Sequence, residues 1–377
     1  MNETINHPAL LPSGMRDVLP PEAELEARTV ERLMDSFAAH GFQRVEPPLL
    51  EFEDSLFAGP GAATAEQTFR VMDPESQRML GFRADTTPQI GRLAVTRLAA
   101  APRPLRLAYA GQCLRVRGGQ VQPERQVAQA GIELIGHDSA LADAEILVAA
   151  ADALAAVGLL QVSFDLTAPR LVTGLLDGVA PVRRAELARA LDRKDAAVVA
   201  ALGGERREIF LALLEATGAA ETAVPALLAI DLPPPARGQA ERMAAIVAAV
   251  RSRSPTLALT IDPVEFRGYQ YHTGVCATVF CGATGAELGR GGRYLCGETE
   301  PATGVTLYPD TIVRVAPPPA LRPRVFVPFG APADQAEKLR AQNFATIAGL
   351  EEAADAPAEA RRQKCSHWLH NGRAVEV

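Results

Sequence analysis

The spacing of apolar residues in the first half of the chain predicts an alternation of helices and strands. After Pro20 and Pro21, apolar residues recur three or four positions apart up to Phe37, which is the pattern of a helix with one buried face, and Gly41 marks its end. Runs with strand character, separated by polar tracts, predict strands. The expected strands are 43–46, 68–72, 79–83, 106–116, 126–135 and 161–166, and further helices are expected at 88–100 and 139–158.

The second half of the chain changes character twice. Residues from about 169 to 250 are rich in Ala and Leu and predict a helical insertion. Strand character then returns, and a proline-rich linker (VAPPPALRP) leads into a short tail with one strand and two helices. These later elements are expected at 256–261, 274–281, 325–327, 333–341 and from Pro357. The sequence therefore predicts an α+β domain over 1–318, dominated by antiparallel strands, and a small α/β domain over 322–377.

The composition is that of an ordinary folded protein. Of the 377 residues, 48% are hydrophobic and 22% are charged, which excludes a wholly disordered chain. The net charge of −7 disfavours nucleic acid as a partner, because surfaces that bind tRNA or DNA are usually basic. The sequence shows no leader pattern and no apolar run of about 20 residues that could cross a bilayer. We therefore expect a cytoplasmic protein without a membrane partner.

One candidate binding segment lies at an expected turn from strand to helix. Asp85, Thr86 and Thr87 precede Pro88 and bring a carboxylate and two hydroxyls to one point. Such a group suits the ammonium of a small ligand. From the spacing alone, capping of the helix by the same residues is the simpler interpretation.

A second candidate lies in the expected strand pair 106–116 and 126–135, together with Arg115. Gln129, Gly131 and Glu133 alternate, so they share one face of a strand. A glycine between two polar residues would leave room for a ligand, although a solvated strand face shows the same alternation.

Two later segments contain further candidates. Residues 267–274 crowd Arg, Tyr, Tyr and His beside glycines, which suits either a pocket with an aromatic wall or an ordinary turn. Residues 289–294 (GRGGRY) look like a glycine-rich turn that could bind an anion, without the spacing of a nucleotide-binding loop. Cys365, His367 and His370 are metal-ligand types, but their spacing favours packing or a turn, so no metal site is expected.

The order and spacing of these segments resemble the catalytic core of histidyl-tRNA synthetases, within the class II aminoacyl-tRNA synthetase family. The resemblance runs from Leu11 (LPSGMRDVLP) to about Thr311. It implies an antiparallel sheet of six or seven strands flanked by helices. The stretch 41–48 resembles the first class II motif, which implies a dimer interface around Pro48.

The resemblance also implies a site for histidine. The residues that would form it are Asp85, Thr87, Arg115, Gln129, Glu133, Arg267, Tyr271 and His272. Asp85, Thr87, Gln129 and Glu133 would surround the amino group, with Tyr271 and His272 on the imidazole side and Arg267 toward the carboxylate. Asp85 stands where the family has Glu, and His272 stands where it has a second Tyr, so the shape of the pocket is expected to differ.

The positions that handle ATP in the synthetases are changed in this chain. The acidic position of the second motif is Arg117, its adenine-stacking ring is Val127, and the arginine of its loop falls at Pro123. The third motif has Thr311 where the family has the arginine that clamps the triphosphate. Loss of cations that stabilise a transferring phosphate costs orders of magnitude in rate. We therefore expect no catalytic residues, no cofactor and no activation of amino acids.

The tail after the linker is about half as long as the anticodon-binding domain of the synthetases, so tRNA binding is not expected. Together these features resemble the regulatory subunits of ATP phosphoribosyltransferase, which are inactive synthetase paralogues. That resemblance implies a short-form catalytic subunit as the partner and histidine as the feedback effector. It also implies a homodimer within a hetero-oligomer, for which a hetero-octamer is one candidate form. The alternatives are a truncated histidyl-tRNA synthetase and a stand-alone histidine sensor.

Overall fold

The structure is a computed structural model that describes residues 10–119, 123–266, 271–297 and 299–377. The chain forms two compact units, the first ending at Pro317 and the second running from Pro318 to Val377. Within the described ranges, none of the helices combines the length and apolar character that crossing a lipid bilayer requires.

The first unit is built on one large sheet. Its order is β1 (Gln43–Arg44), β5 (Leu105–Leu114), β6 (Gln126–Ile135), β12 (Glu300–Leu307), β11 (Glu287–Cys296), β10 (Cys276–Cys281), β7 (Val162–Thr167), β9 (Ala258–Ile261) and β8 (Gly218–Ala219). All neighbours from β5 to β7 are antiparallel, whereas β1 pairs with β5, and β9 with β7, in parallel. The antiparallel core of the α+β fold is thus confirmed, and short strands extend it at both edges.

The prediction of a glycine-rich turn at 289–294 is wrong, because these residues lie inside β11. The glycines serve close strand packing instead: a Cβ at Gly291 would overlap the carbonyl of Gly304 on β12. Glycine inside a strand commonly marks such a close backbone approach. Residues 300–307, for which no strand was expected, pair with β11 on one side and β6 on the other.

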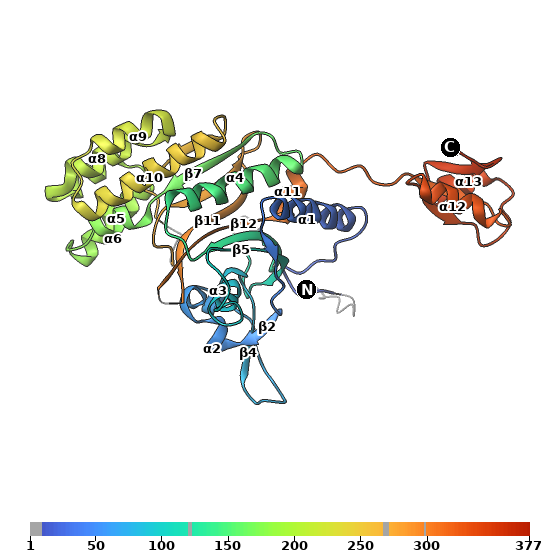
Figure 1. Ribbon diagram of the computed structural model, residues 1–377, viewed down its shortest axis with the longest axis horizontal. Coiled ribbons are helices and arrows are strands. Elements are labelled where there is room, and N and C mark those ends of the chain that lie inside the picture. The colour runs from blue at the N-terminus through green and yellow to red at the C-terminus, as the bar shows by residue number, and fades with distance from the viewer. Residues whose placement is uncertain (1–9, 120–122, 267–270, 298) are drawn as a thin grey trace, which may run out of the picture. The chain divides into compact units, whose positions relative to one another are not determined.

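The two faces of the sheet carry different layers, as Figure 1 shows. On one face, α1 (Glu22–Ala39) and α4 (Ala140–Ala156) pack on apolar residues of β6 such as Ile132 and Leu134. The Ala-rich α4 is apolar on nearly all sides and is therefore buried, and Ser139 caps it by accepting a hydrogen bond from the amide of Ala142. The opposite face carries α3 (Thr87–Val95) over the odd-numbered residues of β5.

Helix α3 ends at Val95, earlier than the predicted end at residue 100. Arg103 explains the early end, because its guanidinium donates hydrogen bonds to the carbonyls of Ala94, Leu98 and Ala101. Beside α3 lies a small sheet that contains the predicted hairpin. Its order is β2 (Leu50–Phe52), β4 (Met79–Phe82) and β3 (Arg70–Met72), and the short α2 (Glu53–Leu56) follows β2.

The stretch after β7 forms a group of helices, which we call the helical segment. It comprises α5 (Pro169–Leu175), α6 (Pro181–Asp192), α7 (Ala196–Leu202), α8 (Arg207–Glu215), α9 (Ala220–Ala229) and α10 (Pro234–Arg253). Figure 1 shows these helices gathered at one end of the sheet. Its last helix, α10, packs against α4 and α5 and so joins the segment to the layer that covers the sheet.

The last helix of the first unit is α11 (Pro309–Val315), and the second unit has its own sheet and core. Its elements are β13 (Arg324–Val327), α12 (Ala333–Ala341), β14 (Ala345–Ala348), α13 (Ala356–Arg362), β15 (His367–His370) and β16 (Arg373–Glu376), with the strands in the order β14, β13, β15, β16. Val325, Leu339 and Leu369 pack on one side of the sheet. His367 packs edge-on against Phe344.

Candidate functional site

The candidate residues meet at a cavity of about 460 Å³ in the first unit. All the candidates that lie in the described part of the chain line it: Asp85, Thr87, Arg115, Gln129, Glu133, Tyr271 and His272. Arg267 lies outside the described residues. The strands β6, β11 and β12 of the large sheet contribute lining residues to it.

Glu133 forms the most deeply buried polar point of the cavity, with 1% of its surface exposed. Gln129, Gly131 and Glu133 do alternate along β6, and both polar side chains line the cavity. The Glu133 carboxylate accepts hydrogen bonds from the Thr87 hydroxyl (3.0 Å) and the Tyr294 hydroxyl (2.9 Å). Burial raises the pKa of Glu133 to about 8, although these hydroxyl donors lower it. An empty cavity therefore holds Glu133 mostly protonated at neutral pH.

The space above Gly131 is not open to a ligand, contrary to the expectation from its spacing. The ring and hydroxyl of Tyr109 fill it, since a Cβ at Gly131 would overlap that side chain. The Tyr109 hydroxyl lies 2.7 Å from the Thr306 hydroxyl and 3.3 Å from that of Thr87. This buried hydroxyl chain fixes Thr87, which in turn donates to Glu133.

The turn before α3 holds the second carboxylate of the cavity. Asp85 accepts hydrogen bonds from the amide of Thr87 and from the side chain of Gln129, both at 3.3 Å. The side-chain carbonyl of Gln129 in turn accepts hydrogen bonds from the backbone amide of Thr86 (3.0 Å) and the thiol of Cys113 (3.2 Å). Asp85 thus both caps the turn and lines the cavity, so the capping and binding interpretations are compatible.

Aromatic side chains form one wall of the cavity. Tyr271 stacks on His272 with ring centroids 4.3 Å apart, and meets Tyr294 edge-on at 6.0 Å. Burial lowers the pKa of His272 to about 4, so its imidazole is neutral at physiological pH. Burial also raises the pKa of Tyr271 well above its usual value. The wall is therefore uncharged and suits a planar ring as its neighbour.

Two guanidinium groups also line the cavity. Arg115 approaches the carbonyl of Ala84 at 3.5 Å. Arg290 makes a bidentate ion pair with Glu287, in which two guanidinium nitrogens lie 2.6 and 2.8 Å from the two carboxylate oxygens. The sequence pointed to Arg290 only as part of a turn that could bind an anion, and it gave no signal for Glu287, because the strand pairing of β11 brings both to the cavity.

Sequence reasoning also left out lining residues of β11, β12 and the start of α11. These are Tyr294, Thr306, Tyr308 and Asp310. Two stretches carried a signal for them: the segment GRGGRY, which ends on Tyr294, and the stretch 304–311 matched to the third motif, which contains the other three.

The positions matched to ATP handling lie at and beyond the edge of the cavity. Val127 lines it and also lines a second cavity of about 290 Å³, which shares Asp310 with the first. Thr311 is buried in the first turn of α11, where its hydroxyl accepts a hydrogen bond from Arg314 (3.2 Å). Burial raises the pKa of Asp310, which accepts a hydrogen bond from the amide of Ala128 (2.8 Å).

Groups of both charges line the cavity. They are the carboxyls of Asp85, Glu133, Glu287 and Asp310 and the guanidiniums of Arg115 and Arg290. Such a set suits a small amino acid, whose ammonium can meet a carboxyl and whose carboxylate can meet a guanidinium. The stacked rings of Tyr271 and His272 favour a ring in its side chain.

A group of carboxylates elsewhere has the spacing of metal ligands. Asp165, Asp262 and Glu265 are half-buried and bring one oxygen each within 4.8 Å of the others. Lys194 binds both oxygens of Asp262 at 2.5 Å and supplies a positive charge there. The lysine gives these acids a partner within the chain.

Three comparisons with known proteins show what this chain is similar to. A family model described as histidyl-tRNA synthetase matches residues 14–312. The chain is 52% identical to the ATP phosphoribosyltransferase regulatory subunit of Paramagnetospirillum magneticum over 100% of both chains, and 52% identical to that of Gluconobacter oxydans over 97% of both. A solved structure titled as an ATP phosphoribosyltransferase regulatory subunit/histidyl-tRNA synthetase from Bacillus halodurans has the same fold, with a TM-score of 0.80, 24% identity, and 96% of this chain and 97% of that one covered.

Proposed function

Because this chain belongs to the family of ATP phosphoribosyltransferase regulatory subunits, we propose that it binds histidine and uses that binding to regulate a catalytic partner. The partner would be a short-form ATP phosphoribosyltransferase subunit, and histidine would act as a feedback inhibitor. A homodimer within a hetero-oligomer, and a cytoplasmic location, belong to the same proposal.

One observation carries the histidine assignment: the carboxyls of Asp85 and Glu133, an aromatic wall and two guanidiniums all line a single cavity. The α-ammonium would lie toward Asp85 and Gln129, and Thr87 and Glu133 would complete that end. The imidazole would pack on Tyr271 and His272, whose neutral rings do not repel it. Arg115 would face the carboxylate, together with Arg267.

We infer further that the chain does not activate amino acids. Adenylate formation requires cations placed on the transferring phosphate. In the position matched to the triphosphate-binding arginine stands the buried Thr311, and the position matched to the adenine-stacking ring is Val127. A histidine-dependent exchange of pyrophosphate into ATP would contradict this inference and favour a truncated synthetase.

The deciding experiment measures phosphoribosyltransferase turnover by the short-form catalytic subunit, with and without this chain, across a histidine titration. Turnover that changes when this chain is added and falls with histidine would support the proposal. A useful feedback needs histidine to favour one state of the complex by about 1–3 kcal/mol. Turnover that is indifferent to this chain at every histidine concentration would reject the regulatory role and leave a stand-alone sensor.

A single substitution links the cavity to that regulation. Glu133→Ala removes the buried carboxyl that Thr87 and Tyr294 hold. Inhibition by histidine should weaken or disappear, while assembly with the catalytic subunit, measured by gel filtration, should persist. Unchanged histidine affinity of this variant in isothermal titration would show that the ligand binds elsewhere.

A further inference from the structure

A buried ion-pair cluster connects the helical segment to the sheet beside the ligand cavity. Its centre is Asp143, in the first turn of α4, which is 6% exposed. Arg293 of β11 donates to Asp143 Oδ1 at 2.7 and 3.0 Å, and Arg242 of α10 donates to Oδ2 at 2.8 and 3.1 Å. Asp138 lies 2.9 Å from Arg242 and 3.2 Å from Arg293. One carboxylate thus holds two arginines from elements that are far apart in the sequence.

Arg293 is attached to the cavity in two ways. The next residue, Tyr294, points to the opposite face of β11 and donates a hydrogen bond to Glu133 (2.9 Å). The Arg293 carbonyl accepts a hydrogen bond from the amide of Thr273 (2.8 Å), which directly follows His272. A displacement of Arg293 therefore moves both the donor to Glu133 and the end of the aromatic wall.

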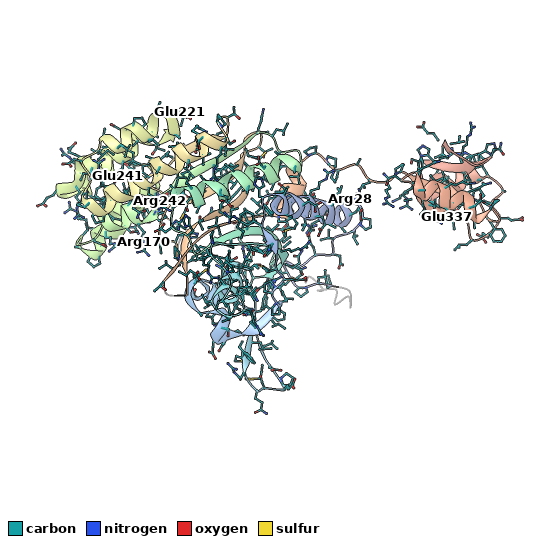
Figure 2. All side chains as sticks on the ribbon, viewed as in Figure 1. Arg28, Arg170, Glu221, Glu241, Arg242 and Glu337 are labelled. Atoms are coloured by element: carbon teal, nitrogen blue, oxygen red, sulfur yellow. The ribbon has the colours of Figure 1, made fainter. Side chains whose placement is uncertain are left out.

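The helical segment touches this assembly at two points. Arg242 lies within α10, which packs on α4, and Arg170 of α5 donates a hydrogen bond to the carbonyl of His272 (3.4 Å). Figure 2 shows Arg242 where the segment meets α4, and Glu221 at the outer edge of the segment. The segment thus contacts Asp143 through Arg242 and the backbone of the aromatic wall through Arg170.

Charge balance identifies Arg242 as the informative residue of the cluster. Asp143 and Arg293 are both nearly fully buried, so they form a neutral pair even without Arg242. Removal of Asp143 would leave the buried Arg293 guanidinium without its main partner, which is strongly destabilising. Removal of Arg242 keeps the buried pair neutral and only frees its position relative to the helical segment.

We propose that Arg293 and Arg242 are positioning residues for the ligand cavity, so that the placement of the helical segment on the sheet sets how tightly the cavity binds histidine. The inference rests on the cavity being the histidine site. It assigns a regulatory role to the helical segment: any partner or movement that shifts α10 acts on Glu133 and on the aromatic wall through Asp143.

The test compares variants of the full chain by isothermal titration with histidine and by thermal unfolding. Arg242→Met removes the link from α10 to Asp143. Arg251→Met is the matched control on the same helix. It breaks the ion pair with the exposed Glu221 and a hydrogen bond to the carbonyl of Leu257, and neither of these partners lines the cavity. Arg242→Met should weaken histidine binding roughly three- to tenfold, whereas Arg251→Met should leave the affinity unchanged.

Two further variants separate positioning from general loosening of the fold. Arg242→Lys keeps the charge but loses the planar fork that binds Asp143 and Asp138, so its affinity should lie between those of wild type and Arg242→Met. In a Tyr294→Phe background, Arg242→Met should weaken binding by less than it does in the wild type, because Tyr294 is one of the two links that it would disturb.

The outcomes are distinct. An Arg242→Met protein that binds histidine as tightly as wild type would overturn the proposal, and so would equal losses in Arg242→Met and Arg251→Met. If Arg242→Met does not fold, the same comparison is made with Arg242→Lys. A wild-type chain that binds no histidine would reject the proposed function itself, and that result is visible before any variant is made.

Discussion

The carboxylate of Glu133 on β6 reaches across β12 to accept a hydrogen bond of 2.9 Å from the hydroxyl of Tyr294 on β11. The two strands are not neighbours, since β12 lies between them. The bond is possible because Gly304 stands opposite Glu133 in β12 and has no side chain in the path of the carboxylate. Three strands therefore cooperate to place one buried acid.

Tyr294→Phe should weaken histidine binding while leaving the fold intact. The substitution removes a hydroxyl that donates to Glu133 but keeps the buried ring. Its main effect is therefore to destabilise the charged form of the Glu133 carboxyl. A hydrogen bond to a charged group is worth about 1.5–3 kcal/mol, which corresponds to about tenfold or more in affinity. Isothermal titration measures the change. Wild-type affinity in this variant would show that the ligand does not depend on the Glu133 carboxylate.

Gly304→Ala should disturb both stability and binding. A methyl group at this position would overlap the Glu133 carboxylate, so either the side chain or the strand must move. Such overpacking costs about 1–3 kcal/mol in the free energy of unfolding. Gly174→Ala in α5 is the matched control, because its Cβ would meet no atom within 4 Å and should be neutral or slightly stabilising. Urea unfolding of both variants checks the difference.

The sequence predicted one half of the site better than the other. Gln129 and Glu133 were found because alternation along a strand is a local property that any single strand displays. Tyr294, which lines the cavity, and Tyr109, which supports Thr87, were not placed in the site, because strand pairing brings them there and sequence periodicity does not reveal it. Their contacts with Glu133 and Thr87 depend on register and on glycines in neighbouring strands.

The main error in the fold has the same origin. Glycines at 289, 291 and 292 suggested a turn, since glycine is frequent in turns. Here they lie in β11, where close approach of β12 excludes a Cβ at Gly291. A sequence pattern alone cannot separate these two uses of glycine, because the neighbouring strand that demands the space is distant in the chain.

Asp143→Asn should destabilise the first unit strongly. The carboxylate is the shared acceptor of Arg242 and Arg293, and an amide would leave the buried Arg293 guanidinium with only the exposed Asp138 as a charged partner. Breaking a buried ion pair on one side costs about 3–5 kcal/mol. Glu221→Gln, which removes the charge of an exposed partner of Arg251, should cost at most about 1 kcal/mol. Equal free energies of unfolding for the two variants in chemical unfolding would show that the Asp143 cluster does not stabilise the first unit strongly.

Histidine binding should release close to one proton at pH 7. Burial raises the pKa of Glu133 to about 8, so the empty cavity holds the proton, whereas a ligand ammonium favours the carboxylate. Affinity should therefore rise with pH by up to about tenfold per unit until about pH 8. The empty fold loses stability over the same rise, because its folded pKa lies above the unfolded value. His272, with a pKa of about 4, does not contribute to this pH dependence.

Calorimetry in buffers of different ionisation enthalpy measures the number of protons released on histidine binding. Glu133→Gln should release none, and a wild type whose binding heat is identical in all buffers would exclude this coupling.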